Sequence, residues 1–234
     1  MRSAPYGTVL HMTTIELAHP STDPVAVPVR WDRRKGAFLL GVPAAWAVLL
    51  FLHPTGDGNL VYPVISGQLG RWQAVHVGMA IFIPLFAYVV WTLTTGVENV
   101  AARTARVLLP VGAVVYGLFE GMLGIGAGAL VGHVQDLPAR DQAVGAALVE
   151  DFFMRTPIFR LVEYGGTFAL GGGIIAAAIA LRHTRTISRT AVGLLVVSAP
   201  LITAHVPPFG PVGLACFVLA VVLSGRSLLT TSSR

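Results

Sequence analysis

Four of the seven histidines lie at the ends of long apolar segments. They are His53, His76, His133 and His205. Imidazole is a common metal ligand and an axial ligand of haem, and helical bundles build such sites from side chains on facing helices. The four histidines therefore form one candidate site for a transition metal or a haem. Two ligand sets remain open: three histidines with a carboxylate, which suit zinc or another divalent ion, or two histidines on either side of a porphyrin.

Three acidic residues are expected on the same side of the protein as these histidines. Asp57 follows the first apolar segment, Glu163 begins the fourth, and Asp151 belongs to the charged segment that precedes it. They are candidates to orient the ligands or to line an entrance to the site. The alternative is that they belong to a solvated face, and that the histidines only meet lipid headgroups or cap helix carbonyls. No H-E-x-x-H or C-x-x-C pattern strengthens the metal hypothesis.

Glu120 lies in the middle of an apolar segment, where an unpaired carboxylate is costly. We expect its side chain to face the interior of a helical bundle, as a proton relay, a coupling residue of a transporter or a structural hydrogen-bonding group. Along one helix at 1.5 Å per residue, it stands about 20 Å from His133. The four histidines are expected near the outer membrane surface. On this basis Glu120 is not expected to share a coordination shell with them.

Glycines recur every three or four residues around Glu120. Small residues at this spacing let a second helix approach closely within a membrane, so the pattern predicts a packing face. The face consists of Gly117, Gly121, Gly124 and Gly128. These glycines follow no strand, which argues against a phosphate-binding loop.

The elements that must position these residues are membrane-spanning helices. Hydrophobic residues make up 54% of the 234-residue chain and charged residues only 12%, with a mean hydropathy of +0.73. Soluble domains carry about a quarter charged residues. The sequence therefore predicts an all-α, polytopic membrane protein with a lipid bilayer as its principal partner. The net charge of +5 comes from basic residues in short groups between the apolar segments, which is a topology signal and does not indicate a nucleic-acid partner.

The apolar segments predict a six-helix transmembrane domain over residues 36–225. Its spans are expected at residues 36–53, 74–95, 107–134, 161–181, 190–205 and 212–224, with an external amphipathic segment at 139–160. Residues 1–35 are expected to form a largely disordered cytoplasmic tail, and residues 226–234 a second cytoplasmic tail. The third span is longer than a bilayer requires and must tilt, bend or project beyond it.

The distribution of arginine and lysine sets the orientation. Most of the 16 basic residues fall in the tails and in the loops that follow the second and fourth spans. Because cytoplasmic loops carry the excess of positive charge, both termini are expected in the cytoplasm. The excess of arginine over lysine and the abundance of alanine, valine and glycine are compatible with a high-GC bacterial source, so the bacterial cytoplasmic membrane is the expected location. A homo-oligomer or a membrane partner subunit is compatible with this topology.

Three functions follow from these features, and no motif selects a reaction or decides whether the protein is an enzyme. The first is a membrane metalloprotein or haemoprotein with redox or lipid-directed chemistry at the outer face. The second is a small-solute or ion transporter or channel that uses Glu120 at the membrane midplane. The third is a non-catalytic membrane scaffold or assembly subunit.

Overall fold

The structure is a computed structural model, which describes residues 33–56 and 60–230. Within these ranges the protein is all-helical, with 86% of residues in helices and no strands. The predicted N-terminal tail up to residue 32, the candidate residue Asp57 and residues 231–234 lie outside the described residues.

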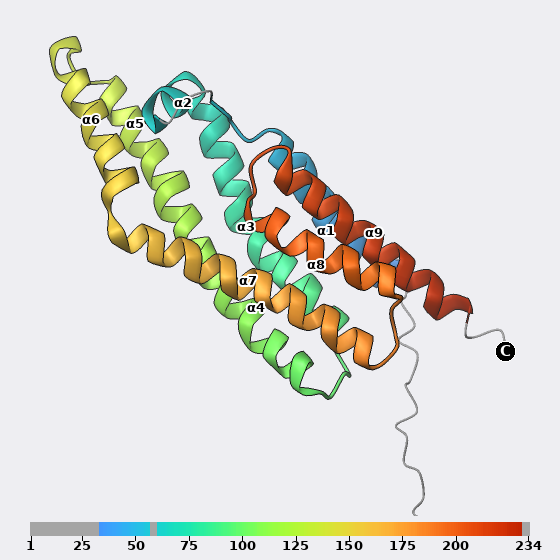
Figure 1. The fold of residues 1–234 in the computed structure, drawn as a ribbon. Coiled ribbons are helices and arrows are strands. Elements are labelled where there is room, and N and C mark those ends of the chain that lie inside the picture. Colours follow the sequence, from blue (N-terminus) through green and yellow to red (C-terminus); the bar gives the residue numbers. More distant parts are fainter. Residues whose placement is uncertain (1–32, 57–59, 231–234) are drawn as a thin grey trace, which may run out of the picture.

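The helices follow one another with short connections (Figure 1). They are α1 (Arg33–Phe51), α2 (Val61–Gly67), α3 (Leu69–Leu93), α4 (Val100–Phe119), the π-helix η1 (Glu120–Gly126), α5 (Ala127–Gln135), α6 (Ala139–Arg155), α7 (Pro157–His183), α8 (Arg189–Thr203) and α9 (Phe209–Thr230). Each of the six predicted spans overlaps one of these helices or a continuous run of them. The last helix continues to Thr230, into the segment expected to be a tail.

Four helical stretches are long and apolar enough to cross a membrane. They are Arg33–Phe51, Leu69–Leu93, Val100–Gln135 and Pro157–His183. Helices α8 and α9 are also apolar, but their segments 189–203 and 209–225 are shorter than the 18 residues required of a candidate span. These properties suggest a membrane protein.

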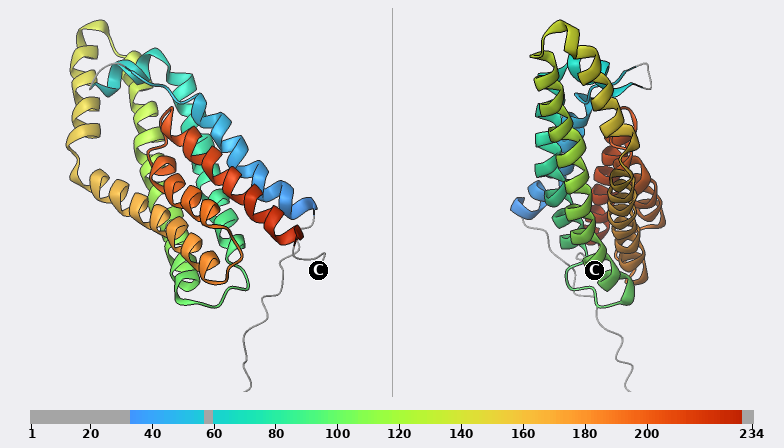
Figure 2. Two further views of the ribbon diagram at one scale, coloured as in Figure 1. Left: turned by 45° about the vertical axis from the view of Figure 1, so that its right-hand side comes forward. Right: turned by 90° about the vertical axis from the view of Figure 1, so that its left-hand side faces the viewer.

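The bundle is built from packed helix pairs. Helix α4 runs along α7, α9 packs against both α8 and α1, and α3 contacts α1, α4 and η1 (Figures 1 and 2). Helices α4 and α7 approach closely because Gly166 faces the backbone of α4. A Cβ atom on Gly166 would lie 2.6 Å from the backbone nitrogen of Tyr116.

The predicted glycine face divides in two. Gly124 and Gly128 face α3, where a Cβ atom would meet the ring of His76 and the side chains of Trp72 and Gln73, respectively. Added Cβ atoms at Gly117 and Gly121 would meet nothing within 4 Å in the described part of the chain. The packing role therefore fits Gly124 and Gly128, and not Gly117 and Gly121.

The third predicted span is part of one long helical stretch, Val100–Gln135, in which α4, η1 and α5 are continuous. Its 36 residues correspond to about 54 Å, well beyond a hydrocarbon core of about 30 Å. The α5 end packs with α2 and α6 around a separate apolar cluster, which includes Ile65, Val131 and Val149. This end of the stretch thus belongs to a cap above the main bundle (Figure 2).

Candidate functional site

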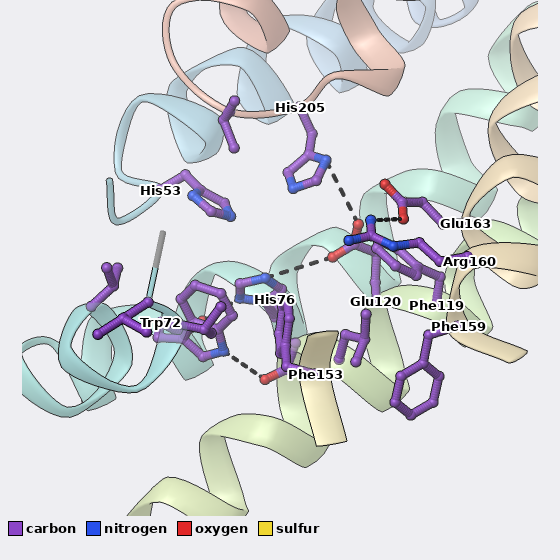
Figure 3. Close-up of a pocket in the computed structure, with 16 residues that line it drawn as sticks. His53, Trp72, His76, Phe119, Glu120, Phe153, Phe159, Arg160, Glu163 and His205 are labelled. Carbon is purple, nitrogen blue, oxygen red and sulfur yellow. Dashed lines mark hydrogen bonds and ion pairs between the residues drawn. The ribbon is translucent and has the colours of Figure 1, made fainter. Parts of the chain in front are cut away.

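Three histidines and one glutamate converge from four separate parts of the bundle. His53 follows α1, His76 lies in α3, His205 follows α8, and Glu120 begins η1. The ring centroid of His53 lies 5.1 Å from that of His76 and 5.1 Å from that of His205. Glu120 Oε2 lies 3.7 Å from His76 Nε2, and Oε1 lies 3.9 Å from His205 Nδ1. Figure 3 shows the three imidazoles and the carboxyl group turned toward one shared space.

Backbone carbonyls determine the tautomers of two of these histidines. His53 Nδ1 lies 2.8 Å from the carbonyl oxygen of Pro54, and His76 Nδ1 lies 2.8 Å from that of Trp72. A carbonyl oxygen can only accept a hydrogen bond, so in each ring Nδ1 carries the proton and donates it. When the ring is neutral, Nε2 therefore presents a lone pair.

Tyr116 has the same effect on the third histidine. Its hydroxyl group donates a hydrogen bond of 2.9 Å to the carbonyl oxygen of Thr203, and its oxygen lies 2.8 Å from His205 Nδ1. Because the single hydroxyl proton is directed to Thr203, His205 Nδ1 donates to the tyrosine oxygen. His205 Nε2 is then left with a lone pair, as in the other two rings.

The polar atoms of the site are buried and incompletely satisfied. Glu120 is 1% exposed, His53 4% and His76 3%. Within the described residues, His53 Nε2 and Glu120 Oε1 are buried and have no hydrogen-bond partner. Leaving such atoms unpaired costs about 1–3 kcal/mol each, and a bound ligand would remove that cost.

Trp72 holds the α3 side of the site in place. Its indole Nε1 donates a 2.7 Å hydrogen bond to the carbonyl oxygen of Gly124 in η1, and its ring lies 4.2 Å from that of His76 between centroids. Gly124 leaves space for the imidazole of His76, because a Cβ atom there would overlap the ring. On the other side of α3, Arg71 donates to the carbonyl oxygens of Leu52 and His53 and ties the end of α1 to this helix.

The expectation that Glu120 stands apart from the histidines is wrong. That expectation rested on the distance between Glu120 and His133 along one helix. His133 lies exposed in the last turn of α5 and does not line the site. Helix α3 begins at Leu69, so His76 lies two turns inside it and reaches the level of Glu120. The π-helix begins at Glu120, and π-helical turns often occur at functional sites.

The three outer carboxylates have different surroundings. Glu163 lines the cavity beside the histidines and forms a 2.8 Å ion pair with Arg160 (Figure 3). Asp151 pairs with Arg155 on the surface of α6 and does not line this cavity. Asp57 lies outside the described residues.

Sequence analysis did not single out Tyr116 or Trp72 as parts of the site. A signal was available, because Tyr116 precedes Glu120 by four residues and Trp72 precedes His76 by four. Side chains four residues apart share one face of a helix, which is the signal that places each ring beside its ionisable neighbour.

The histidines and Glu120 line a cavity of about 290 Å³. Apolar side chains form most of the rest of its wall, among them Val64, Phe119, Leu123, Phe153 and Phe159. As the side chains stand, no group of three or more His, Cys, Asp or Glu residues in the described ranges is close enough to hold a metal ion. The site is thus a buried set of donor atoms around a cavity, without a closed coordination shell.

No family model matches the chain, and no curated protein or solved structure matches it either.

Proposed function

We propose that the protein is a multi-pass membrane metalloprotein, in which His53, His76, His205 and Glu120 bind one divalent transition metal ion at the outer end of the bundle. The bundle spans the bacterial cytoplasmic membrane six times, with both termini in the cytoplasm. Metal-assisted chemistry, redox or lipid-directed, then takes place where the cavity meets the outer membrane surface.

The arrangement of helix ends supports this topology. The start of α1, the end of α9 and the α3–α4 and α7–α8 connections lie at one end of the bundle (Figures 1 and 2). Arginines gather at this end, including Arg34, Arg103, Arg106 and Arg189. Such an excess of positive charge is typical of the cytoplasmic side. The ends of α1 and α8, which precede His53 and His205, then face outward.

The depth of Glu120 supports a metal site over a midplane transport site. Its carboxylate is within 3.9 Å of His205, which follows the last residue of α8, Thr203. Glu120 therefore lies level with the outer end of α8 and not halfway along the bundle. The transporter hypothesis requires Glu120 to be a coupling carboxylate at the midplane. Its depth near the outer end of α8 therefore favours the metal site.

Two of the ring distances are compatible with a single metal ion. With a metal–nitrogen distance of about 2.1 Å and a ring radius of about 1.1 Å, two imidazoles on a tetrahedral ion have centroids about 5.2 Å apart. His53 meets this expectation with both other rings, at 5.1 Å each. Side-chain rotations are then needed to bring the Nε2 atoms and the carboxylate onto one ion, because the His205 atom nearest to Glu120 is Nδ1 as the side chains stand.

The same distances argue against haem. Two axial imidazoles on opposite sides of one iron have centroids about 6.4 Å apart, with the porphyrin plane between them. His53 instead lies edge-on against His76 and His205, so no planar macrocycle fits between these pairs. Three imidazoles and a carboxylate suit zinc or another divalent ion of similar preference.

The observation that carries the proposal is the shared tautomer. All three histidines commit Nδ1 to a hydrogen bond and keep a lone pair on Nε2, as metal-bound histidines do when their other nitrogen is held by a carbonyl or another acceptor.

Metal analysis of the purified protein tests the proposal. Protein purified in mild detergent from cells supplied with zinc, iron and copper is expected to contain about one metal ion per chain. His53→Ala, His76→Ala and His205→Ala are each expected to lose it. His133→Ala is the matched control, because this histidine is exposed and outside the cavity. Metal-free wild-type protein that also fails to bind added zinc or cobalt would overturn the proposal.

A further inference from the structure

The cavity beside the histidines has two chemically different kinds of lining. Polar groups are supplied by the three imidazoles, the Glu120 carboxylate and the Arg160–Glu163 pair. Apolar side chains come from four elements: Val64 of α2, Leu123 of η1, Phe153 of α6 and Phe159 of α7. Binding pockets of this type orient a ligand through a few polar groups and enclose the rest of it in apolar surface.

Two phenylalanines on either side of the α6–α7 connection at Thr156 line the cavity. They are Phe153 and Phe159, and Phe159 is 4% exposed. Leu60, which also lines the cavity, is 58% exposed, and Arg160 and Glu163 pair across its edge with partly exposed side chains. The opening therefore combines a charged pair with apolar side chains.

Apolar surface continues from this opening along α7. Ile158 is 50% exposed and Leu161 is 69% exposed, next to the residues that line the cavity. In the proposed topology, this part of α7 begins at the outer surface of the membrane, where an apolar side chain would meet lipid. This surface gives a ligand in the bilayer an apolar path to the opening, beside the Arg160–Glu163 pair.

We infer that the cavity binds an amphiphile, whose compact oxygen-bearing head group coordinates the metal ion while its apolar body lies between Phe153 and Phe159. This inference rests on the proposed metal site and identifies the class of molecule that the site takes. A volume of about 290 Å³ holds a head group and a few carbon atoms, because a water molecule in the liquid already takes about 30 Å³. The remainder of a longer chain extends through the opening beside Leu60.

A pair of chelating probes tests the inference on the full-length protein in detergent. The protein is loaded with Co²⁺, whose visible absorption reports its ligands, and titrated with acetohydroxamate or hexanohydroxamate. The two probes share one head group and differ by four methylenes. Each buried methylene strengthens binding by roughly fourfold. Hexanohydroxamate is expected to bind at least about 30-fold more tightly, after correction for its partition into the micelles.

Two variants assign the chain-length preference to the cavity. Phe159→Ala is expected to reduce the preference to less than about fivefold, while acetohydroxamate still binds as it does to the wild type. Phe153→Ala, at a less buried position, provides the same test if Phe159→Ala fails to fold. Phe168→Ala is the control, because Phe168 lies on the same helix, is 75% exposed and does not line the cavity.

The outcomes separate this inference from the proposed function. Cobalt binding with equal affinity for both hydroxamates would overturn the amphiphile and leave the metal site standing. A chain-length preference that survives both phenylalanine substitutions would overturn it as well. Failure to bind cobalt would instead remove the metal site itself, and the inference with it.

Discussion

Tyr116 Oη lies 2.8 Å from His205 Nδ1 and donates its own proton to the carbonyl oxygen of Thr203, 2.9 Å away. The tyrosine of α4 thereby connects the end of α8 to the ring of His205 and orients its Nε2 atom. Hydrogen bonds of this kind to metal-bound histidines are known to tune metal affinity through ring orientation and basicity.

Tyr116→Phe is therefore expected to weaken metal binding. The substitution keeps the buried ring but removes the oxygen that accepts from His205 Nδ1. Loss of such a partner typically reduces affinity about 10–100-fold. Competition with a coloured chelator measures the change. Tyr164→Phe is the control, because Tyr164 is 54% exposed on α7. Equal affinity in wild type and Tyr116→Phe would show that this hydrogen bond does not support the site.

Glu120→Gln is expected to affect stability differently with and without metal. Without metal, the substitution replaces a buried carboxylate, whose Oε1 atom has no partner within the described residues, by a neutral amide that is less costly to bury, so the thermal midpoint should stay constant or rise. With metal at about 100 times its wild-type dissociation constant, the wild type should gain about 2.7 kcal/mol. The variant should lose most of this gain, because a neutral amide is a poor ligand.

Thermal unfolding in detergent, with either EDTA or zinc present, measures both effects of Glu120→Gln. Asp151→Asn is the control, since Asp151 is exposed on α6 and pairs with Arg155 outside the cavity. A Glu120→Gln protein that keeps the full stabilisation by zinc would exclude Glu120 as a ligand.

Sequence patterns predicted the helical architecture. They also predicted that His53 and His205 lie at the same end of the bundle, because the end of an apolar run shows where a helix ends. The place of Glu120 depended on which other helix lies beside it. From the sequence, its distance could be measured only along its own helix, to His133. In the fold, helix packing places its carboxylate beside His76 of α3. Nothing in the hydrophobic periodicity indicated the π-helix that begins at Glu120, since it lies within one continuous helical stretch, Val100–Gln135.

Gly124→Ala is expected to destabilise the protein and the metal site together. A Cβ atom at this position would overlap the ring of His76, which is fixed by its hydrogen bond to the carbonyl oxygen of Trp72. Overpacking of this kind costs about 1–3 kcal/mol. Gly121→Ala is the matched control, because it lies in the same π-helix with nothing within 4 Å of the added atom. Thermal midpoints and zinc affinity of the two variants provide the comparison, and equal values for both would contradict the close contact.

The six-span topology can be tested with single cysteines. The chain has one cysteine, so Cys216→Ser provides a cysteine-free background. Arg140→Cys places a thiol at an exposed position of α6, and Arg189→Cys places one at the exposed start of α8. In intact spheroplasts, a membrane-impermeant maleimide should label position 140 and leave position 189 unlabelled until the membrane is permeabilised. Labelling of both positions in intact spheroplasts would place α6 and the start of α8 on one side of the membrane. Because α7 alone connects them, that result would exclude α7 as a span and with it the outward orientation of the histidine site.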